Sequence, residues 1–194
     1  SCNPLIIYPL AVLSFKCANL SSDSCRFFVR AGLPGPVEQR QLYDLLIECD
    51  GDFVPPLSFR RSTTQAALSG SEHNPDGVRD YFNALIAQHV VLCAGPGRIV
   101  GFLSFRPEYT CGALSDGATY CYLSTMAVSH ACRGQHISPR LYRAAMDWAR
   151  EHLPGRPVLL RTWSTNRAQA HLMPELGFEE VLRLPNDRGC GVDT

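Results

Sequence analysis

The segment from Met126 to Pro139, which reads MAVSHACRGQHISP, combines residue types that suit the binding of an anion. It ends an apolar run, and Ser138 and Pro139 are typical of a helix start, as a capping hydroxyl and a first helical residue. The first amides of a helix lack partners and carry partial positive charge, to which Arg133 would add. The pattern predicts a strand, a tight loop and a helix that bind a phosphate-bearing ligand. An ordinary capped helix with a surface arginine is the alternative interpretation.

The patterns around this segment predict the elements that position it. Apolar side chains at Leu42, Leu45, Leu46 and Cys49 share one helix face, and the other helices repeat this spacing. Runs of β-branched and aromatic residues between Gly, Pro and Asn turns predict strands. Helices are expected over 37–49, 78–88, 139–153 and 167–176. Strands are expected over 25–30, 89–94, 99–105, 118–128, 158–165 and 178–184, with a short last strand from 190, polar loops over 58–77 and 108–117, and one helical turn near 63–68.

This order of elements predicts the fold class. Gly95 to Arg98 form a hairpin turn between two strands, whereas the helix before residue 158 makes a crossover. We therefore expect an α/β (α+β) domain with a mixed, largely antiparallel central sheet flanked by helices. Residues 25–194 are expected to form this single domain, and residues 1–24 an N-terminal extension of unassigned role.

Composition and charge exclude several classes of protein. Hydrophobic residues make up 45% and charged residues 19% of the chain, which is incompatible with disorder throughout. Eighteen basic residues balance eighteen acidic ones, so no net field favours nucleic acid or an anionic membrane. The longest apolar run, 4–15, falls short of the roughly 20 residues of a membrane-spanning helix. We expect no nucleic-acid partner and no membrane insertion.

The cysteines and the N-terminal run bear on the compartment. Nine cysteines without a CxxC pair favour reduced, mostly buried thiols, and the histidine spacings match no zinc motif, so no metal is expected. Leu5 to Leu13 has the length of a secretory core, but a basic segment before it and a cleavage site after it are missing. A cytoplasmic protein is the interpretation we favour over a secreted one.

Two motifs resemble those of the GNAT N-acetyltransferase superfamily. The strand end Met126-Ala127-Val128 and the loop Arg133-Gly134-Gln135-His136-Ile137-Ser138 resemble its acyl-CoA-binding motif, in which the loop reads Arg or Gln, two residues, Gly, one residue, then Gly or Ala. His136 and Ser138 stand where that motif has small residues. Asn166, which opens a helix ending in Leu176-Gly177-Phe178, resembles the family's later motif. The runs 161–166 and 186–194 are similar to a bacterial subgroup.

The resemblance implies transfer of an acetyl group from acetyl-CoA to an amine of a small molecule or a protein, by direct attack in a ternary complex. Main-chain groups of Met126 and Val128 would hold the pantetheine arm, and amides of the loop would hold the pyrophosphate. A monomer or homodimer is expected. The implied cofactor-binding residues are Met126, Ala127, Val128, Arg133, Gly134, Gln135, His136, Ile137, Ser138, Asn166 and Met173.

The general acid is the position at which the chain departs from the family. Many members have a tyrosine four residues before the glycine of Leu-Gly-Phe, where it protonates the leaving thiolate, and here that residue is Met173. Replacement candidates are Tyr142, Ser124, Tyr122 and His171, each with a purely structural role as the alternative. A thiolate also leaves without help, since its pKa is only about 8.5 by analogy with cysteine.

Two other functions compete with acetyl transfer. Met173 and the altered loop are compatible with a non-catalytic acyl-CoA-binding or sensor domain. A nucleotide-binding fold would also place a loop before a helix, but it requires parallel strands on both sides of that loop. For the acceptor, the acidic side chains of loops 50–77 and 108–117, such as Glu108 and Asp116, suggest attraction of a cationic amine.

Overall fold

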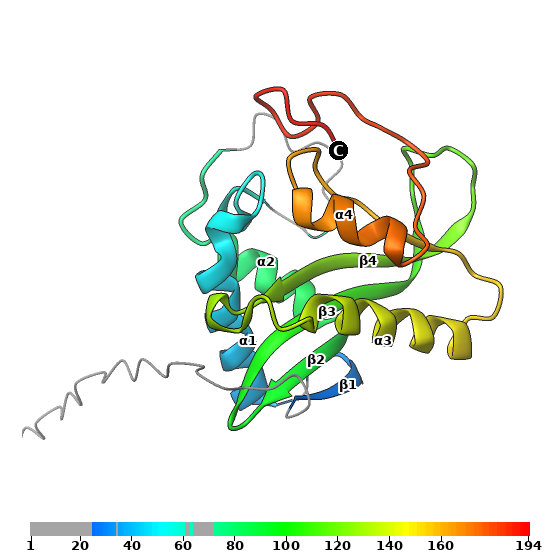
Figure 1. The fold of residues 1–194 in the computed structure, drawn as a ribbon. Coiled ribbons are helices and arrows are strands. Elements are labelled where there is room, and N and C mark those ends of the chain that lie inside the picture. The colour runs from blue at the N-terminus through cyan, green and yellow to red at the C-terminus, as the bar shows by residue number, and fades with distance from the viewer. Residues whose placement is uncertain (1–24, 34, 61–62, 64–71) are drawn as a thin grey trace, which may run out of the picture.

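The computed structural model describes residues 25–33, 35–60, 63 and 72–194, and shows a five-stranded sheet with helices on both faces (Figure 1). The extension over 1–24 and most of the helical turn expected near 63–68 lie outside the described residues. In chain order the elements are β1 (Arg26–Ala31), α1 (Pro36–Cys49), α2 (Gly77–Ile86), β2 (His89–Gly95), β3 (Arg98–Thr110), β4 (Thr119–Val128), α3 (Ile137–His152), β5 (Val158–Leu160) and α4 (Arg167–Glu175), with short 3₁₀ turns η2 (Asp50–Asp52), η3 (Leu57–Phe59) and η4 (His130–Cys132).

Strand pairing confirms the predicted mixed sheet. The spatial order is β1-β2-β3-β4-β5, in which the first four strands are antiparallel neighbours and β5 runs parallel to β4. The crossover through α3 makes this parallel pair possible. A nucleotide-binding fold with parallel strands throughout is therefore excluded.

Side chains that alternate along the central strands build two hydrophobic cores, one on each face of the sheet. In β2, Val91 and Cys93 pack with α3 and Met173 of α4 on one face. Val90 and Leu92 pack with α1 and α2 on the other. Because both faces are covered, the middle strands are apolar at consecutive positions.

The strands differ from expectation mainly near the C-terminus. β3 continues to Thr110, into the segment expected to be a loop, because its bulged end still pairs with β4. β5 ends at Leu160 instead of residue 165, and no strand forms over 178–184. Leu184 and Thr194 exchange main-chain hydrogen bonds of 2.8 and 3.0 Å, so the expected terminal hairpin is a closed loop rather than a strand ladder. Val181 and Leu182 are exposed, and apolar residues alone do not make a strand without a neighbour.

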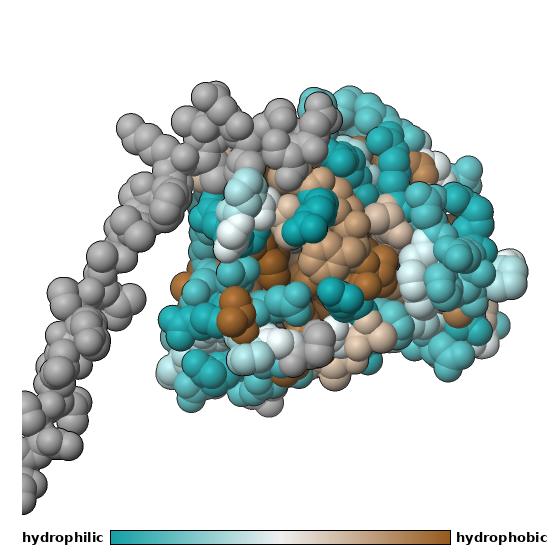
Figure 2. Space-filling view, turned by 90° about the horizontal axis from the view of Figure 1, so that it is seen from below, coloured by the Kyte–Doolittle hydropathy of each residue, from teal (hydrophilic) through white to brown (hydrophobic). Residues whose placement is uncertain are grey.

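β1 and β5 are the edge strands of the sheet, and Figure 2 views the molecule from the side on which β1 lies in Figure 1. Apolar residues gather near the middle of this face and hydrophilic residues surround them.

None of the helices in the described part of the chain has the length and apolar character needed to cross a membrane. All seven described cysteines are free thiols and six of them are buried, in agreement with the sequence prediction.

Candidate active site

A cavity of about 590 Å³ lies where β4 and β5 separate. The two strands pair only from Cys121 to Leu123 of β4, whereas β4 runs on to Val128. The amide of Ser129 donates to the carbonyl of Val100 in β3, at 2.9 Å. Because main-chain groups alternate along a strand, those of Met126 and Val128 then point away from β3, toward the open side. Both residues line the cavity, as do Ala127 and Ser124.

The start of α3 forms one end of this cavity and corrects the predicted helix start. The helix begins at Ile137, two residues before Pro139, which was expected to be its first residue. Its N-cap is His136, in the left-handed conformation with φ 55°, and not Ser138. Ser138 is therefore the second helical residue and does not cap the helix, and Pro139 is the third. No side chain caps the helix, so its first amides remain available to a ligand, except at Pro139, which has none.

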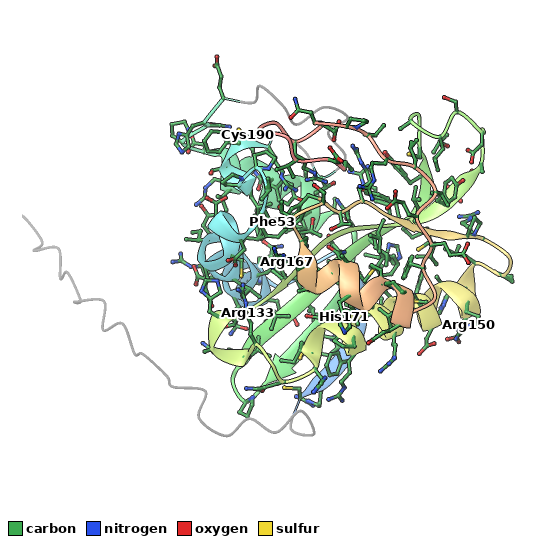
Figure 3. All side chains as sticks on the ribbon, turned by 45° about the horizontal axis from the view of Figure 1, so that its top comes forward. Phe53, Arg133, Arg150, Arg167, His171 and Cys190 are labelled. Carbon is green, nitrogen blue, oxygen red and sulfur yellow. The ribbon has the colours of Figure 1, made fainter. Side chains whose placement is uncertain are left out.

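The guanidinium group of Arg133 is bonded to Asp52 and Val128. Its Nη2 lies 2.5 Å from a carboxylate oxygen of Asp52, and its Nε donates to the carbonyl of Val128 at 3.3 Å. Figure 3 shows Arg133 near the beginning of α3. Although partial burial opposes it, hydrogen bonding to Arg133 and His130 holds the pKa of Asp52 below its usual value. The charge of Arg133 is thus shared with Asp52, which reduces what it adds to an anion site and ties the loop to η2.

α1 and η2 hold the loop before α3 through further contacts. Glu48 accepts hydrogen bonds from the His130 amide, at 2.6 Å, and from the hydroxyl of Ser129, at 3.0 Å. Cys49, Asp52 and His130 bring ligand-type atoms within 4.8 Å of one another. However, Arg133 contacts two of these three groups, and burial, with the nearby Glu48, raises the pKa of the Cys49 thiol to about 11. A guanidinium and a protonated thiol do not suit a metal, so we assign none here.

Three of the four candidate acids line the cavity, and Tyr142 has the most suitable environment. Its buried hydroxyl accepts a hydrogen bond from Gln169 Nε2 at 2.7 Å, and it has no second partner among the described residues. Burial raises its pKa above the ordinary tyrosine value. Ser124 already donates to Gln88 Oε1, at 2.5 Å, and Tyr122 is buried and stacked on Tyr109. The hydroxyl hydrogen of Tyr142 therefore has no acceptor among the described residues.

The remaining predicted residues divide between the cavity and its surroundings. Asn166 lines the cavity and caps α4, because its Oδ1 accepts from the amide of Gln169 at 3.2 Å. His171 has a side chain that is 85% exposed and lies near Glu175, so the structure does not bring it to the cavity (Figure 3). Met173 is packed in the core beside α3 and does not line the cavity either. Gly134, His136, Ile137 and Ser138 line it, but Gln135 does not.

Sequence reasoning missed a group of arginines in the cavity wall: Arg60, Arg161 and Arg188. Arg60 follows η3, Arg161 follows β5, and Arg188 lies in the C-terminal loop. Two of them stack on aromatic rings: Arg60 lies over the ring of Phe53, and Arg188 lies over the ring of Trp163. The centroids of these two rings are 6.0 Å apart. Figure 3 shows Phe53 close to the start of α4, marked by Arg167. No local spacing signals this convergence.

The left-handed conformation of His136 gives the first prediction. A residue with a Cβ in this conformation costs about 1–2 kcal/mol, whereas glycine adopts it freely at an entropic cost of about 0.5–1 kcal/mol. We expect His136→Gly to raise the free energy of unfolding by about 0.5–1 kcal/mol, measured by urea denaturation. His136→Ala, which removes the imidazole and keeps the strain, should bring no gain. Gly134→Ala, at φ 76°, should instead destabilise the same loop. Equal stability of the Gly and Ala variants would contradict the prediction.

Comparisons with known proteins agree with this geometry. The family model described as "Acetyltransferase (GNAT) family" matches residues 41–178. No curated protein sequence matches the chain. Among solved structures, the ribosomal-protein-alanine N-acetyltransferase from Brucella melitensis biovar Abortus 2308 is similar at 16% identity and a TM-score of 0.53, over 81% of this chain and 94% of that one.

Two further structures have the same fold. One is Arabidopsis thaliana NAA60 in complex with a bisubstrate analogue, at 16% identity and a TM-score of 0.55, over 87% of this chain and 94% of that one. The other is AAC(6')-Iy in complex with the bisubstrate analogue CoA-S-monomethyl-acetylneamine, at 15% identity and a TM-score of 0.54, over 82% of this chain and 95% of that one. At such identities the likeness shows the fold, whereas the family model covers more than half of the chain. The chain therefore belongs to the GNAT family of acetyltransferases.

Proposed function

We propose that the chain transfers an acetyl group from acetyl-CoA to an amine of a small molecule or a protein, by direct attack in a ternary complex. The observation that carries this proposal is the separation of β4 from β5, which leads along an open strand edge to the uncapped start of α3. Residues 25–194 would act as one acetyltransferase domain, with residues 1–24 as an extension to it.

The described residues fit the co-substrate at two places. The main-chain groups of Met126 and the amide of Val128 on the open edge of β4 suit the amides of a pantetheine arm, which would add to β4 like a short strand. The Val128 carbonyl already accepts from Arg133 and Cys49. The amides of Ile137 and Ser138, with those of the preceding loop, suit the pyrophosphate. The amide of Arg133 is less available, because it donates to the carbonyl of His130 at 3.4 Å.

Acetyl-CoA supplies an activated thioester, and the chain supplies position, polarisation and a proton. The amides on the open edge of β4 stabilise negative charge on the carbonyl oxygen when a neutral amine attacks. The carbon–sulfur bond then breaks and Tyr142 donates its proton to the departing sulfur, in the role that a tyrosine at position 173 has in many family members. The proton that the attacking amine loses passes to solvent, and solvent restores the Tyr142 hydroxyl. Gln169 holds the Tyr142 oxygen from the other side, which leaves the hydroxyl hydrogen free to point into the cavity.

Binding of CoA tests the proposal directly. We expect acetyl-CoA and free CoA to raise the Tm, ATP to leave it unchanged, and Arg133→Ala to weaken CoA binding about tenfold, by about 1.4 kcal/mol. The physical reason is that Arg133 fixes the loop to Val128 and Asp52. Arg143→Ala, an exposed position on α3, is the matched control. Absence of a shift with either CoA species would refute the proposal.

Turnover separates the enzyme from the non-catalytic acyl-CoA-binding domain that Met173 allows. Release of CoA thiol, followed with a panel of amines, is expected to exceed the hydrolysis of acetyl-CoA without amine. Tight binding of CoA together with no amine-dependent release would favour the sensor domain instead.

A further inference from the structure

The acceptor end of the cavity is lined by cations. Arg60 and Arg188 are 8% and 7% exposed, and the side chain of Arg161 is 14% exposed. Arg60 Nη2 and Arg188 Nη1 both donate to the carbonyl of Val54, at 3.2 and 3.0 Å, so the two guanidinium groups converge on one point.

This cluster lies far from the proposed pyrophosphate site. Tyr122 interacts electrostatically with each of the three arginines. It lies six residues before Val128 on β4, which is roughly 20 Å away at about 3.3 Å per residue. Val128 leads to the start of α3, where a pyrophosphate is expected. The arginines are therefore at the other end of the open strand edge. Because the thioester of acetyl-CoA is at the opposite end of the molecule from its pyrophosphate, we place the acceptor at this end.

The carboxylates of the described residues balance this charge only in part, because Asp187 serves both Arg161 and Arg188. Arg161 pairs with Asp187 at 3.2 Å, and Asp187 also accepts from the hydroxyl of Thr194. Among the described residues, Arg60 donates to the carbonyls of Val54 and Pro55 and is hydrogen-bonded to the side chain of Tyr81. Arg188 donates to the Val54 carbonyl and the Thr194 hydroxyl. Asp50 attracts Arg60 from a distance, but its own oxygens accept from the amide and hydroxyl of Ser58.

The sequence limits what else can supply negative charge. The segment 61–71, which follows Arg60, contains no Asp or Glu, and Asp23 is the one acidic side chain outside the described residues. Asp52, the acidic residue that lines the cavity, is already bonded to Arg133. Burial and the neighbouring Arg60 and Arg161 lower the pKa of Arg188 to about 10. Two buried guanidinium groups thus hold mainly neutral partners, an arrangement that an anion would stabilise.

Two of the acidic residues expected to attract a cationic amine have partners away from the cavity. Glu108 lies 3.3 Å from Arg156, and Asp116 accepts from the hydroxyl of Tyr120 and the amide of Ala118. Neither residue lines the cavity. The described wall at this end of the cavity thus carries three arginines and neither of these two carboxylates.

We propose that the acceptor is an amine that also carries a carboxylate, and that Arg60 and Arg188, supported by Arg161, bind this carboxylate. The inference rests on the proposed acetyl transfer and names its substrate class. The planar fork of arginine matches a carboxylate with two parallel hydrogen bonds, and the carboxylate would hold the amine near the thioester. A diamine or an aminoglycoside-like polycation would be repelled from the same wall.

A comparison of matched acceptors with the wild-type enzyme tests this class. We would measure CoA release and Tm with the common amino acids, their amides, phosphoethanolamine and linear diamines, all with acetyl-CoA present. The best amino acids are expected to exceed their amides at least tenfold in kcat/KM and to give the larger Tm shift. A panel in which no carboxylate raises either quantity above its amide overturns the inference, as does a preference for diamines. Preference for phosphoethanolamine over every carboxylate would also overturn it, and assign the site to phosphate.

Variants locate the effect and separate it from failure of the acetyl-CoA site. Arg188→Met and Arg60→Met are expected to raise the KM of the best carboxylated acceptor at least tenfold and to leave the KM of acetyl-CoA unchanged. Arg188→Lys keeps the charge without the fork, and serves if the methionine variant does not fold. Arg183→Met, exposed in the same C-terminal segment, is the control. Loss of acetyl-CoA binding in the wild type would defeat the proposed function itself, whereas intact acetyl-CoA binding with equal use of acids and amides defeats only this inference.

Discussion

Replacement of Tyr142 by phenylalanine is expected to slow acetyl transfer about a hundredfold without changing the affinity for acetyl-CoA. The substitution removes only the hydroxyl, whose oxygen accepts from Gln169 and whose hydrogen we propose as the proton source. A hundredfold is at the low end of what general acids contribute, because a thiolate of pKa about 8.5 is already a fair leaving group. The aromatic ring stays, so the packing against β4 should be retained.

Single-turnover rates in H₂O and D₂O would test this prediction independently of product release. The wild type should show a solvent isotope effect that the Phe variant lacks. Because burial raises the pKa of Tyr142 above its ordinary value, the hydroxyl keeps its proton from pH 6 to 9, and loss of this acid should not lower the wild-type rate in that range. Tyr43→Phe, on α1 and away from the cavity, is the control. A wild-type single-turnover rate in Tyr142→Phe would show that the thiolate leaves unaided.

Local patterns explain why so much of the site could be predicted from the sequence. The run through Val128 and the helix of Leu141 and Ala145 are set by periodicities of two and 3.6, which need no knowledge of the rest of the fold. The cap of α4 by Asn166 is equally local. The start of α3 was misplaced because His136 adopts a conformation that sequence rules reserve for glycine.

The parts that could not be predicted depend on contacts between distant segments. β5 ends after Leu160 because the chain then leaves β4, and Arg161 pairs with Asp187 of the C-terminal loop. Arg60 and Arg188 meet only because both reach the same carbonyl, that of Val54. The sequence shows that acidic residues lie in the loops 50–77 and 108–117, but it does not show which cation each of them pairs with.

Gly77→Ala is expected to lower the free energy of unfolding by about 3 kcal/mol, at the upper end of what overpacking usually costs. Gly77 begins α2 and is buried against η3. A Cβ at this position would lie 2.3 Å from the carbonyl oxygen of Ser58 and 2.7 Å from its carbonyl carbon. These are main-chain atoms, held by hydrogen bonds from Ser58 to Asp50 and from the Asn74 amide to Ser58, so they cannot rotate away as a side chain would.

Helix propensity acts in the opposite direction and is the smaller effect. Alanine is favoured over glycine inside a helix by about 1 kcal/mol. If a small shift of α2 relieved most of the contact, this preference would offset the remaining cost, and the free energy of unfolding would not change. Gly51→Ala provides the comparison, because a Cβ there meets nothing within 4 Å. Thermal unfolding should show a Tm lower by roughly 6–12 °C for Gly77→Ala and nearly unchanged for Gly51→Ala.

The same variant connects the packing of α2 to the acceptor site. Ser58 lies two residues before Arg60, so displacement of the Ser58 main chain should move the guanidinium that we assign to acceptor binding. The KM of the acceptor is then expected to rise in Gly77→Ala at a temperature at which the variant is still folded, while the KM of acetyl-CoA stays the same. An unchanged acceptor KM together with the lowered Tm would mean that η3 absorbs the shift, and that the bonds of Arg60 to Val54, Pro55 and Tyr81 hold it in place.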